Sequence, residues 1–151
     1  MFVIGRYVDS LAKVTYLAAF IPVIMGMGGN IGTQSSTIVV RGLATGRIHF
    51  RDIWQVVSKE LSVGLILGVV YGVLIAAVAQ ISYGTLPVAL AVALAVLSSM
   101  SIAAFVGSAV PMLFERINVD PAVATGPFVT TAIDIISVFI YFSIATALLG
   151  I

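Results

Sequence analysis

Long apolar stretches separated by short polar segments dominate this chain. No Asp, Glu, Lys or Arg occurs from Val14 to Val40 or from Leu61 to Phe114, and after Asp120 the only charged residue is Asp134. A membrane-spanning helix needs about 20 mainly apolar residues. We therefore expect four spans, at residues 14–40, 61–82, 86–114 and 121–149.

The composition supports a protein that lies almost wholly in lipid. Hydrophobic residues make up 61% of the chain and charged residues only 9%, whereas a soluble domain carries about 25% charged residues. We predict an all-α integral membrane protein that forms a single transmembrane domain over residues 1–151 and contacts membrane lipid. The net charge of +1 predicts no nucleic-acid binding, and the absence of cysteine excludes thiolate metal sites.

Turn and capping signals mark the ends of the predicted spans. The run from Tyr83 to Pro87 is typical of a tight turn between the second and third spans. Asp120 is expected to be the N-cap of the fourth span, with Pro121 at its first helical position. Residues 49–60 predict a short amphipathic helix on the membrane surface, with Trp54 near the interface.

The basic residues predict the orientation. Two segments between spans contain five of the seven basic residues, namely Arg41, Arg47, Arg51, Lys59 and Arg116. Segments rich in Lys and Arg remain on the cytoplasmic side of a membrane. We therefore expect a multi-pass protein of the cell (inner) membrane, with both of these segments in the cytoplasm and both chain ends outside.

A polar stripe runs along the fourth span. Thr130, Asp134, Ser137 and Tyr141 lie on one helical face of an otherwise apolar segment. A charge at membrane depth costs about 2.5–3.5 kcal/mol on insertion scales, so Asp134 indicates a function. Its oxygen-rich surroundings suit a hard cation such as Mg²⁺, which often keeps its bound water. The alternative is a protonated Asp134 that is hydrogen-bonded within a helix bundle.

The first span contains a second unusual run, from Pro22 to Gln34, with glycine at 26, 28, 29 and 32. Proline and glycine weaken helices, and irregular backbone at membrane depth occurs where protein or water covers it. We expect freed carbonyls here to face an aqueous cavity together with Asn30 and Gln34. A glycine face could equally serve close helix packing.

Small residues recur on the second and third spans. Gly64, Gly68, Gly72 and Ala76 are four residues apart, a spacing that lets helix backbones approach closely. The third span has a weaker face, which we expect to pack and to form interhelical hydrogen bonds: Ser98, Ser101, Ala104, Gly107 and Ser108. The spans contain no Ser–His or Asp–Asp pair, and the single His49 lies between spans, so the sequence predicts no enzyme.

Two motifs together resemble the MgtE family of magnesium channels. The first is Pro22-Val-Ile-Met-Gly-Met-Gly-Gly-Asn-Ile-Gly-Thr-Gln34, followed by Arg41-Gly-Leu-Ala-Thr-Gly46. The second runs from Asp120-Pro-Ala122 through Gly126-Pro127 to Thr130, Thr131 and Asp134. The motifs occur in the family's order and in register with the spans, and the resemblance covers nearly the whole chain from about Val14 onward.

The resemblance implies a homodimer with a pore on its symmetry axis and five transmembrane helices in each subunit. Asp134 from both subunits would bind a largely hydrated Mg²⁺, the transported ion, and the backbone carbonyl of Thr130 would assist. The implied pore lining comes from the glycine-containing helix and the last helix: Gly28, Gly29, Asn30, Gln34, Gly126, Pro127 and Ser137.

The chain also departs from this family pattern. Only four spans fit, so the first family helix is missing or reduced to Met1–Arg6, and we expect a fragment. The cytoplasmic N-terminal and CBS domains of longer members are absent, and Gly126 replaces an Asn that some relatives carry. Two alternatives to a channel are a secondary transporter that exchanges Mg²⁺ for Na⁺ or H⁺, and a non-conducting membrane scaffold.

Overall fold

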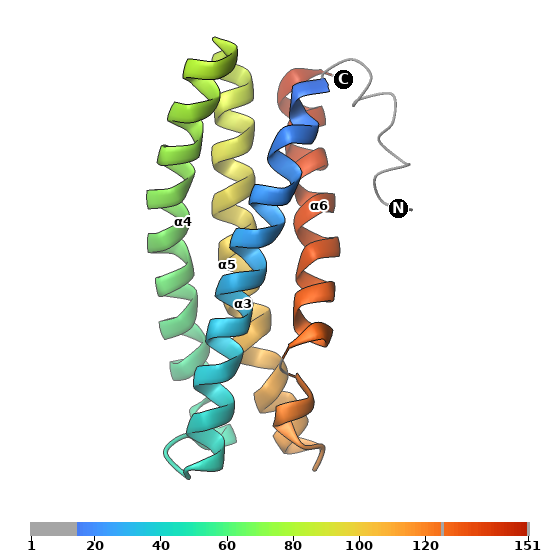
Figure 1. Cartoon of the computed structure of the whole chain (residues 1–151). Coiled ribbons are helices and arrows are strands. Elements are labelled where there is room, and N and C mark those ends of the chain that lie inside the picture. The colour runs from blue at the N-terminus through green and yellow to red at the C-terminus, as the bar shows by residue number, and fades with distance from the viewer. Residues whose placement is uncertain (1–14, 125, 151) are drawn as a thin grey trace.

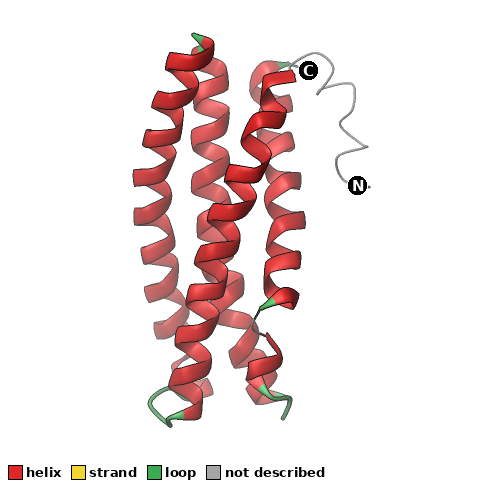
Figure 2. Ribbon diagram, viewed as in Figure 1, coloured by secondary structure: helices red, strands yellow, loops and turns green. Residues whose placement is uncertain are grey.

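A computed structural model describes residues 15–124 and 126–150 of the chain. The segment Met1–Arg6 and Val14, the expected start of the first span, lie outside these described residues. The described part consists of helices joined by short connections and contains no strand (Figure 2). Its elements are η1 (Thr15–Phe20), α3 (Ile21–Ala44), η2 (Phe50–Asp52), α4 (Ile53–Tyr83), α5 (Leu86–Arg116), η3 (Pro121–Ala124) and α6 (Pro127–Leu149).

Four helical segments are long and apolar enough to cross a membrane: Thr15–Ala44, Phe50–Tyr83, Leu86–Arg116 and Pro127–Leu149. This confirms the four predicted spans and the all-α membrane fold. The 31 residues of α4 extend about 46 Å at 1.5 Å per residue. The hydrocarbon core is only about 30 Å thick, so the ends of α4 reach beyond it.

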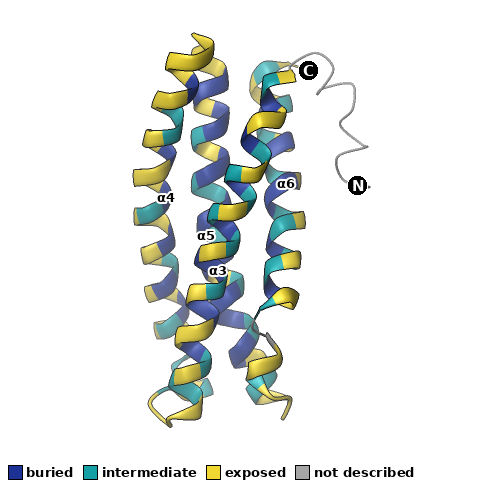
Figure 3. Cartoon of the chain, in the orientation of Figure 1, coloured by how far each residue is buried: buried dark blue, intermediate teal, exposed yellow. Residues whose placement is uncertain are grey.

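Helix α5 is the centre of the bundle. It packs against α4, α3 and α6, while α3 also packs against α6 (Figure 1). Most of the inward surface of α5 is buried and consists of small residues, whereas α4 exposes a broad apolar side to its surroundings (Figure 3). That exposed side includes Ile66, Val73 and Ile81, as expected of a helix in contact with lipid.

Glycines bring α4 close to α5. A methyl group added at Gly64 would lie 2.7 Å from the Ala104 side chain and 2.8 Å from the Met100 carbonyl oxygen. Methyl groups added at Gly68 and Gly72 would lie about as close to the α5 backbone. The predicted packing role of this glycine series is therefore confirmed.

The small face of α5 differs in detail from the prediction. Gly107 does pack tightly, because a methyl group there would collide with the carbonyl oxygen of Gly32 in α3. However, Ser101 and Ser108 donate hydrogen bonds to carbonyls of their own helix, at Leu97 and Ala104. The expectation of interhelical hydrogen bonds is wrong for these two serines.

The fourth span begins later than predicted. Pro121 opens the short helix η3, and α6 starts only at Pro127. The Asp120 carboxylate accepts a hydrogen bond of 2.9 Å from the backbone N–H of Ala122, so it caps η3 instead of the spanning helix. Gly126 precedes α6 with φ of 70° and ψ of −134°, a conformation that residues with side chains rarely adopt.

Two segments that we expected to be irregular or separate are continuous helix. Helix α3 runs through all four glycines without a break, and Pro22 lies in its first turn, so the predicted free carbonyls do not form there. Residues 49–60 are not a separate surface helix, because α4 already begins at Ile53. Trp54 on this first turn is 80% exposed.

The segments that carry the basic residues lie together. The connection after α3 and the connection after α5 occupy one end of the bundle, and the turn at Gly84 lies at the other end (Figure 1). This arrangement agrees with the predicted placement of both basic segments on one side of the membrane.

The α4–α5 contact leads to a test of stability. Gly64→Ala is expected to lower the free energy of unfolding by about 1–3 kcal/mol, because the added methyl group overpacks a backbone contact. Gly26→Ala is the matched control, since no atom lies within 4 Å of the added group. Thermal unfolding of the two variants in the same detergent measures the difference, and equal stability would contradict the close contact.

Candidate ion-binding site

Helix α3 has two opposite faces. The face toward α5 is buried and contains Gly28 and Gly32. The other face exposes Asn30, Gln34 and Thr37. Polar side chains are costly against lipid, so this exposed polar face requires water or another protein surface.

Asp134 of α6 lies at the edge of this polar face. A methyl group added at Gly29 of α3 would lie 3.7 Å from Asp134 Oδ1. The Asp134 side chain is half-buried. Among residues 15–124 and 126–150, no hydrogen bond or ion pair involves its carboxylate. The alternative of an Asp134 hydrogen-bonded within the subunit therefore has no partner in this part of the chain.

The predicted polar stripe of α6 divides into two parts. Thr130 and Asp134 are half-buried, toward the beginning of the helix. Ser137 and Tyr141 are buried in the subunit. The Tyr141 hydroxyl donates a 2.9 Å hydrogen bond to the carbonyl of Leu17 in η1. Only the first part of the stripe therefore remains available to an ion.

The Thr130 hydroxyl is hydrogen-bonded within the first turn of α6. This hydroxyl donates to the Gly126 carbonyl at 3.1 Å and lies 3.3 Å from the Pro127 carbonyl. The Thr130 side chain thus stabilises its own helix, which leaves its backbone carbonyl as the group that the resemblance assigns to the ion.

The expected pore-lining residues also divide into an accessible group and a buried group. Gly29, Asn30 and Gln34 lie on the accessible side of α3. Gly126 and Pro127, at the start of α6, are also accessible. By contrast, Gly28 and Ser137 lie in the core, on the sides of their helices that face α5. Residues in this buried position can support the site by packing behind it, whereas the accessible residues are better placed to contact an ion.

Ser99 of α5 is a buried residue beside the site that was not predicted from the sequence. Its hydroxyl lies 2.6 Å from the Ser137 hydroxyl, and both serines are buried. Spacing on the third span favoured the neighbouring Ser98, because Ser98 and Ser101 share a face. The spacing of four residues that links Ser99 to Ala103 and Gly107, opposite the glycines of α3, would have identified the correct face.

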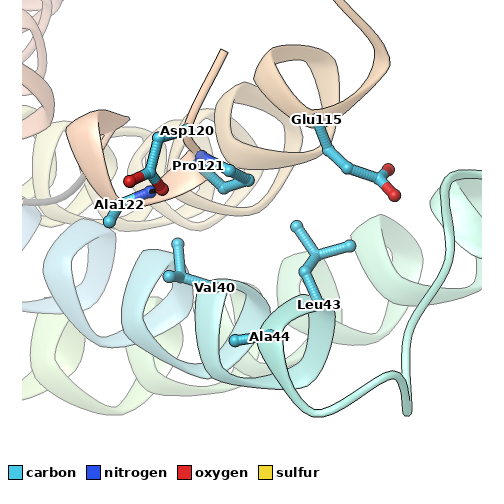
Figure 4. Close-up of a pocket in the computed structure, with 7 residues that line it drawn as sticks. All are labelled: Val40, Leu43, Ala44, Glu115, Asp120, Pro121 and Ala122. Carbon is cyan, nitrogen blue, oxygen red and sulfur yellow. Dashed lines mark hydrogen bonds between the residues drawn. The ribbon is translucent and has the colours of Figure 1, made fainter. Parts of the chain in front are cut away.

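A cavity lies at the end of the bundle that carries the basic residues, away from Asp134. Its volume is about 300 Å³, and side chains at the end of α3 face η3 and the end of α5 across it (Figure 4). Glu115 and Asp120 are at opposite ends of this cavity as drawn, with apolar residues between them. No group of three or more His, Cys, Asp or Glu side chains converges anywhere in the described residues.

The polar face of α3 can be tested by chemical labelling, since the chain has no native cysteine. A cysteine at Asn30 or Gln34 is expected to react about tenfold or more faster with a membrane-impermeant methanethiosulfonate than a cysteine at Ile66, because the reagent needs a hydrated thiolate. Ile66 is the control, since it is equally a spanning residue and 64% exposed. Equal, slow labelling at all three positions would mean that the α3 face is dry.

Comparison with known proteins agrees with this geometry. The sequence model of the MgtE family, described as a divalent cation transporter, matches residues 21–144. The magnesium transporter MgtE of Bacillus subtilis (strain 168) is 38% identical over 145 residues, which cover 96% of this chain and 32% of that protein. The magnesium transporter MgtE of Thermus thermophilus is 39% identical over 140 residues, which cover 92% of this chain and 31% of that protein.

The chain spans about one third of the length of these curated relatives. The family match covers most of the described residues and includes both polar motifs, from the glycine run of α3 to Asp134 in α6. Together with the four membrane-spanning helices, these similarities show that the chain is a multi-pass membrane protein of the MgtE family of divalent cation transporters.

Proposed function

We propose that this chain forms the membrane pore of a magnesium transporter, in which two copies place their Asp134 carboxylates around one hydrated Mg²⁺. One observation carries the proposal: Asp134 is a half-buried carboxylate in a membrane span, without a hydrogen bond or ion pair in the described residues. A group of this kind is costly in a membrane and usually marks an ion pathway.

The proposed dimer follows from what one subunit lacks. A single chain contributes one carboxylate to the last span, Asp134, and its polar α3 face has no cover among the described residues. A second copy related by a twofold axis would bring an identical face opposite the first. The two carboxylates would then balance the charge of one divalent cation, and water between the faces would hydrate Asn30 and Gln34.

The ligands suit an ion that keeps its water. Mg²⁺ dehydrates reluctantly and is commonly held by one or two carboxylates with several waters retained. In the proposed site, Asp134 would be joined by neutral groups: the Thr130 carbonyl, the backbone at Gly29 and the amides of α3. Such groups would contact bound water, and the membrane potential would drive flow by about 2.3 kcal/mol per charge per 100 mV.

The relatives support the choice of ion. The two proteins compared above are named magnesium transporters, and each is nearly 40% identical to this chain across its spans. The region matched by the family model, residues 21–144, contains both the glycine run and Asp134.

Asp134→Asn tests the proposal directly. The substitution is expected to weaken Mg²⁺ binding by about 10- to 100-fold, because removing one charge close to the ion costs roughly 1–3 kcal/mol in a partly hydrated site. Calorimetric titration of the purified protein in lipid nanodiscs measures the change. Asp52→Asn is the control: it removes one negative charge at the end of the bundle, away from the proposed site, and should leave Mg²⁺ binding unchanged. Native-like binding by Asp134→Asn would overturn the site.

Flux measurements in proteoliposomes separate the remaining mechanisms. Mg²⁺ uptake that follows voltage alone supports a channel. Uptake that requires a Na⁺ or H⁺ gradient at fixed voltage would replace the channel with an exchanger at the same site. Binding at Asp134 without any flux would indicate a scaffold that holds Mg²⁺.

A further inference from the structure

We propose that Ser99 of α5 is a positioning residue for the ion site, and that its hydrogen bond to Ser137 fixes the rotation of α6 that presents Asp134. The inference rests on the proposed function. It assigns a role to a buried residue that touches neither the ion nor the accessible face.

Ser99 of α5 is in direct contact with Ser137 of α6. The hydroxyl oxygens of Ser99 and Ser137 are 2.6 Å apart, and the two residues are 1% and 2% exposed. The Ser99 hydroxyl also lies 3.5 Å from the carbonyl oxygen of Ile24 in α3. One side chain of α5 therefore reaches both helices that form the candidate site.

There is little free space around the contact between the two serines. A methyl group added at Gly28 of α3 would lie 2.5 Å from the Ser99 hydroxyl oxygen and 3.0 Å from that of Ser137. The α3 backbone thus closes over the serine pair. Helices α3, α5 and α6 meet at this point, so a change at either serine affects the packing of all three helices.

The serine contact lies close to the Asp134 carboxylate along both α6 and α3. Ser137 is one helical turn beyond Asp134 on α6, and Gly28 directly precedes Gly29, the α3 residue next to the Asp134 carboxylate. A group about 5 Å from a helix axis moves by nearly 2 Å when the helix rotates by about 20°. Loss of the serine contact would therefore displace Asp134 by enough to disturb a site for one hydrated ion.

If the Ser99 hydroxyl is removed, the Ser137 hydroxyl can donate to a carbonyl of its own helix instead, and α6 can then change its geometry. Ser101, Ser108 and Ser143 all donate to a carbonyl four residues earlier in their own helix. Without Ser99, Ser137 would have the same option, and serines that bond in this way tend to bend helices. We therefore expect the substitution to act on the geometry of α6 as well as on stability.

The test compares Mg²⁺ affinity with thermal stability in lipid nanodiscs for Ser99→Ala, Ser137→Ala, the double variant and Ser108→Ala. Ser108 is a matched control, because it is a buried serine of α5 whose hydrogen bond stays within its own helix. Ser99→Ala and Ser137→Ala are each expected to weaken Mg²⁺ binding about three- to tenfold, the size expected for one buried hydrogen bond. The double variant should be no weaker than the single variants, since both remove one contact.

Ser108→Ala is expected to keep native Mg²⁺ affinity, because its hydrogen bond stays within α5 and does not reach α6. Equal loss of affinity in Ser108→Ala would overturn the positioning role, because any buried serine would then have the same effect. The role is also overturned if Ser99→Ala and Ser137→Ala bind Mg²⁺ within about twofold of native, the scatter of such comparisons, while Asp134→Asn loses binding. If Asp134→Asn itself binds normally, the proposed function fails, and this inference fails with it.

Discussion

The bundle depends on the close approach of other helices to α5. Between spans in lipid, little hydrophobic driving force remains, so association relies on van der Waals contact and hydrogen bonds. Gly64 of α4 and Gly28 of α3 leave no room for a side chain at these contacts, and neither does Gly107 of α5 where it meets Gly32 of α3. Because α5 uses two of its sides in this way, it becomes the buried centre of the bundle, and the outer surfaces of α3 and α4 stay exposed.

This packing also determines where the polar groups of α3 lie. Gly28 and Gly32 are about half a turn from Asn30 and Gln34, so burial of the glycines turns the amides outward. Helix α6 then packs beside α3, which leaves Asp134 at the margin of the amide face. The glycine run was open to two interpretations, packing or an aqueous cavity. In the structure, different residues of the same run account for the packing and for the exposed polar face.

Apolar length alone was enough to predict the four spans and the all-α membrane fold, and glycine spacing was enough to predict the α4–α5 contact. It was harder to predict which side of each helix faces its neighbours. Helix α5 is apolar on nearly every side, so its pattern does not distinguish Ser98 from Ser99. The late start of α6 was missed because Asp120 and Pro121 form a normal helix start, but here they begin η3. The continuity of α3 depends on its neighbours, since α5 and α6 cover the glycine face.

The small number of ligands near Asp134 is consistent with transport. A cage of several carboxylates would strip and retain a divalent cation, whereas conduction requires binding strong enough for entry and weak enough for release. One carboxylate from each subunit, with neutral carbonyls and amides nearby, would attract Mg²⁺ by charge and contact it mainly through its waters. In that arrangement the distance between the carboxylates matters more than the number of ligands. For this reason, a buried contact that sets the rotation of α6, such as the one between Ser99 and Ser137, would have as much influence on the ion as a residue that touches its water.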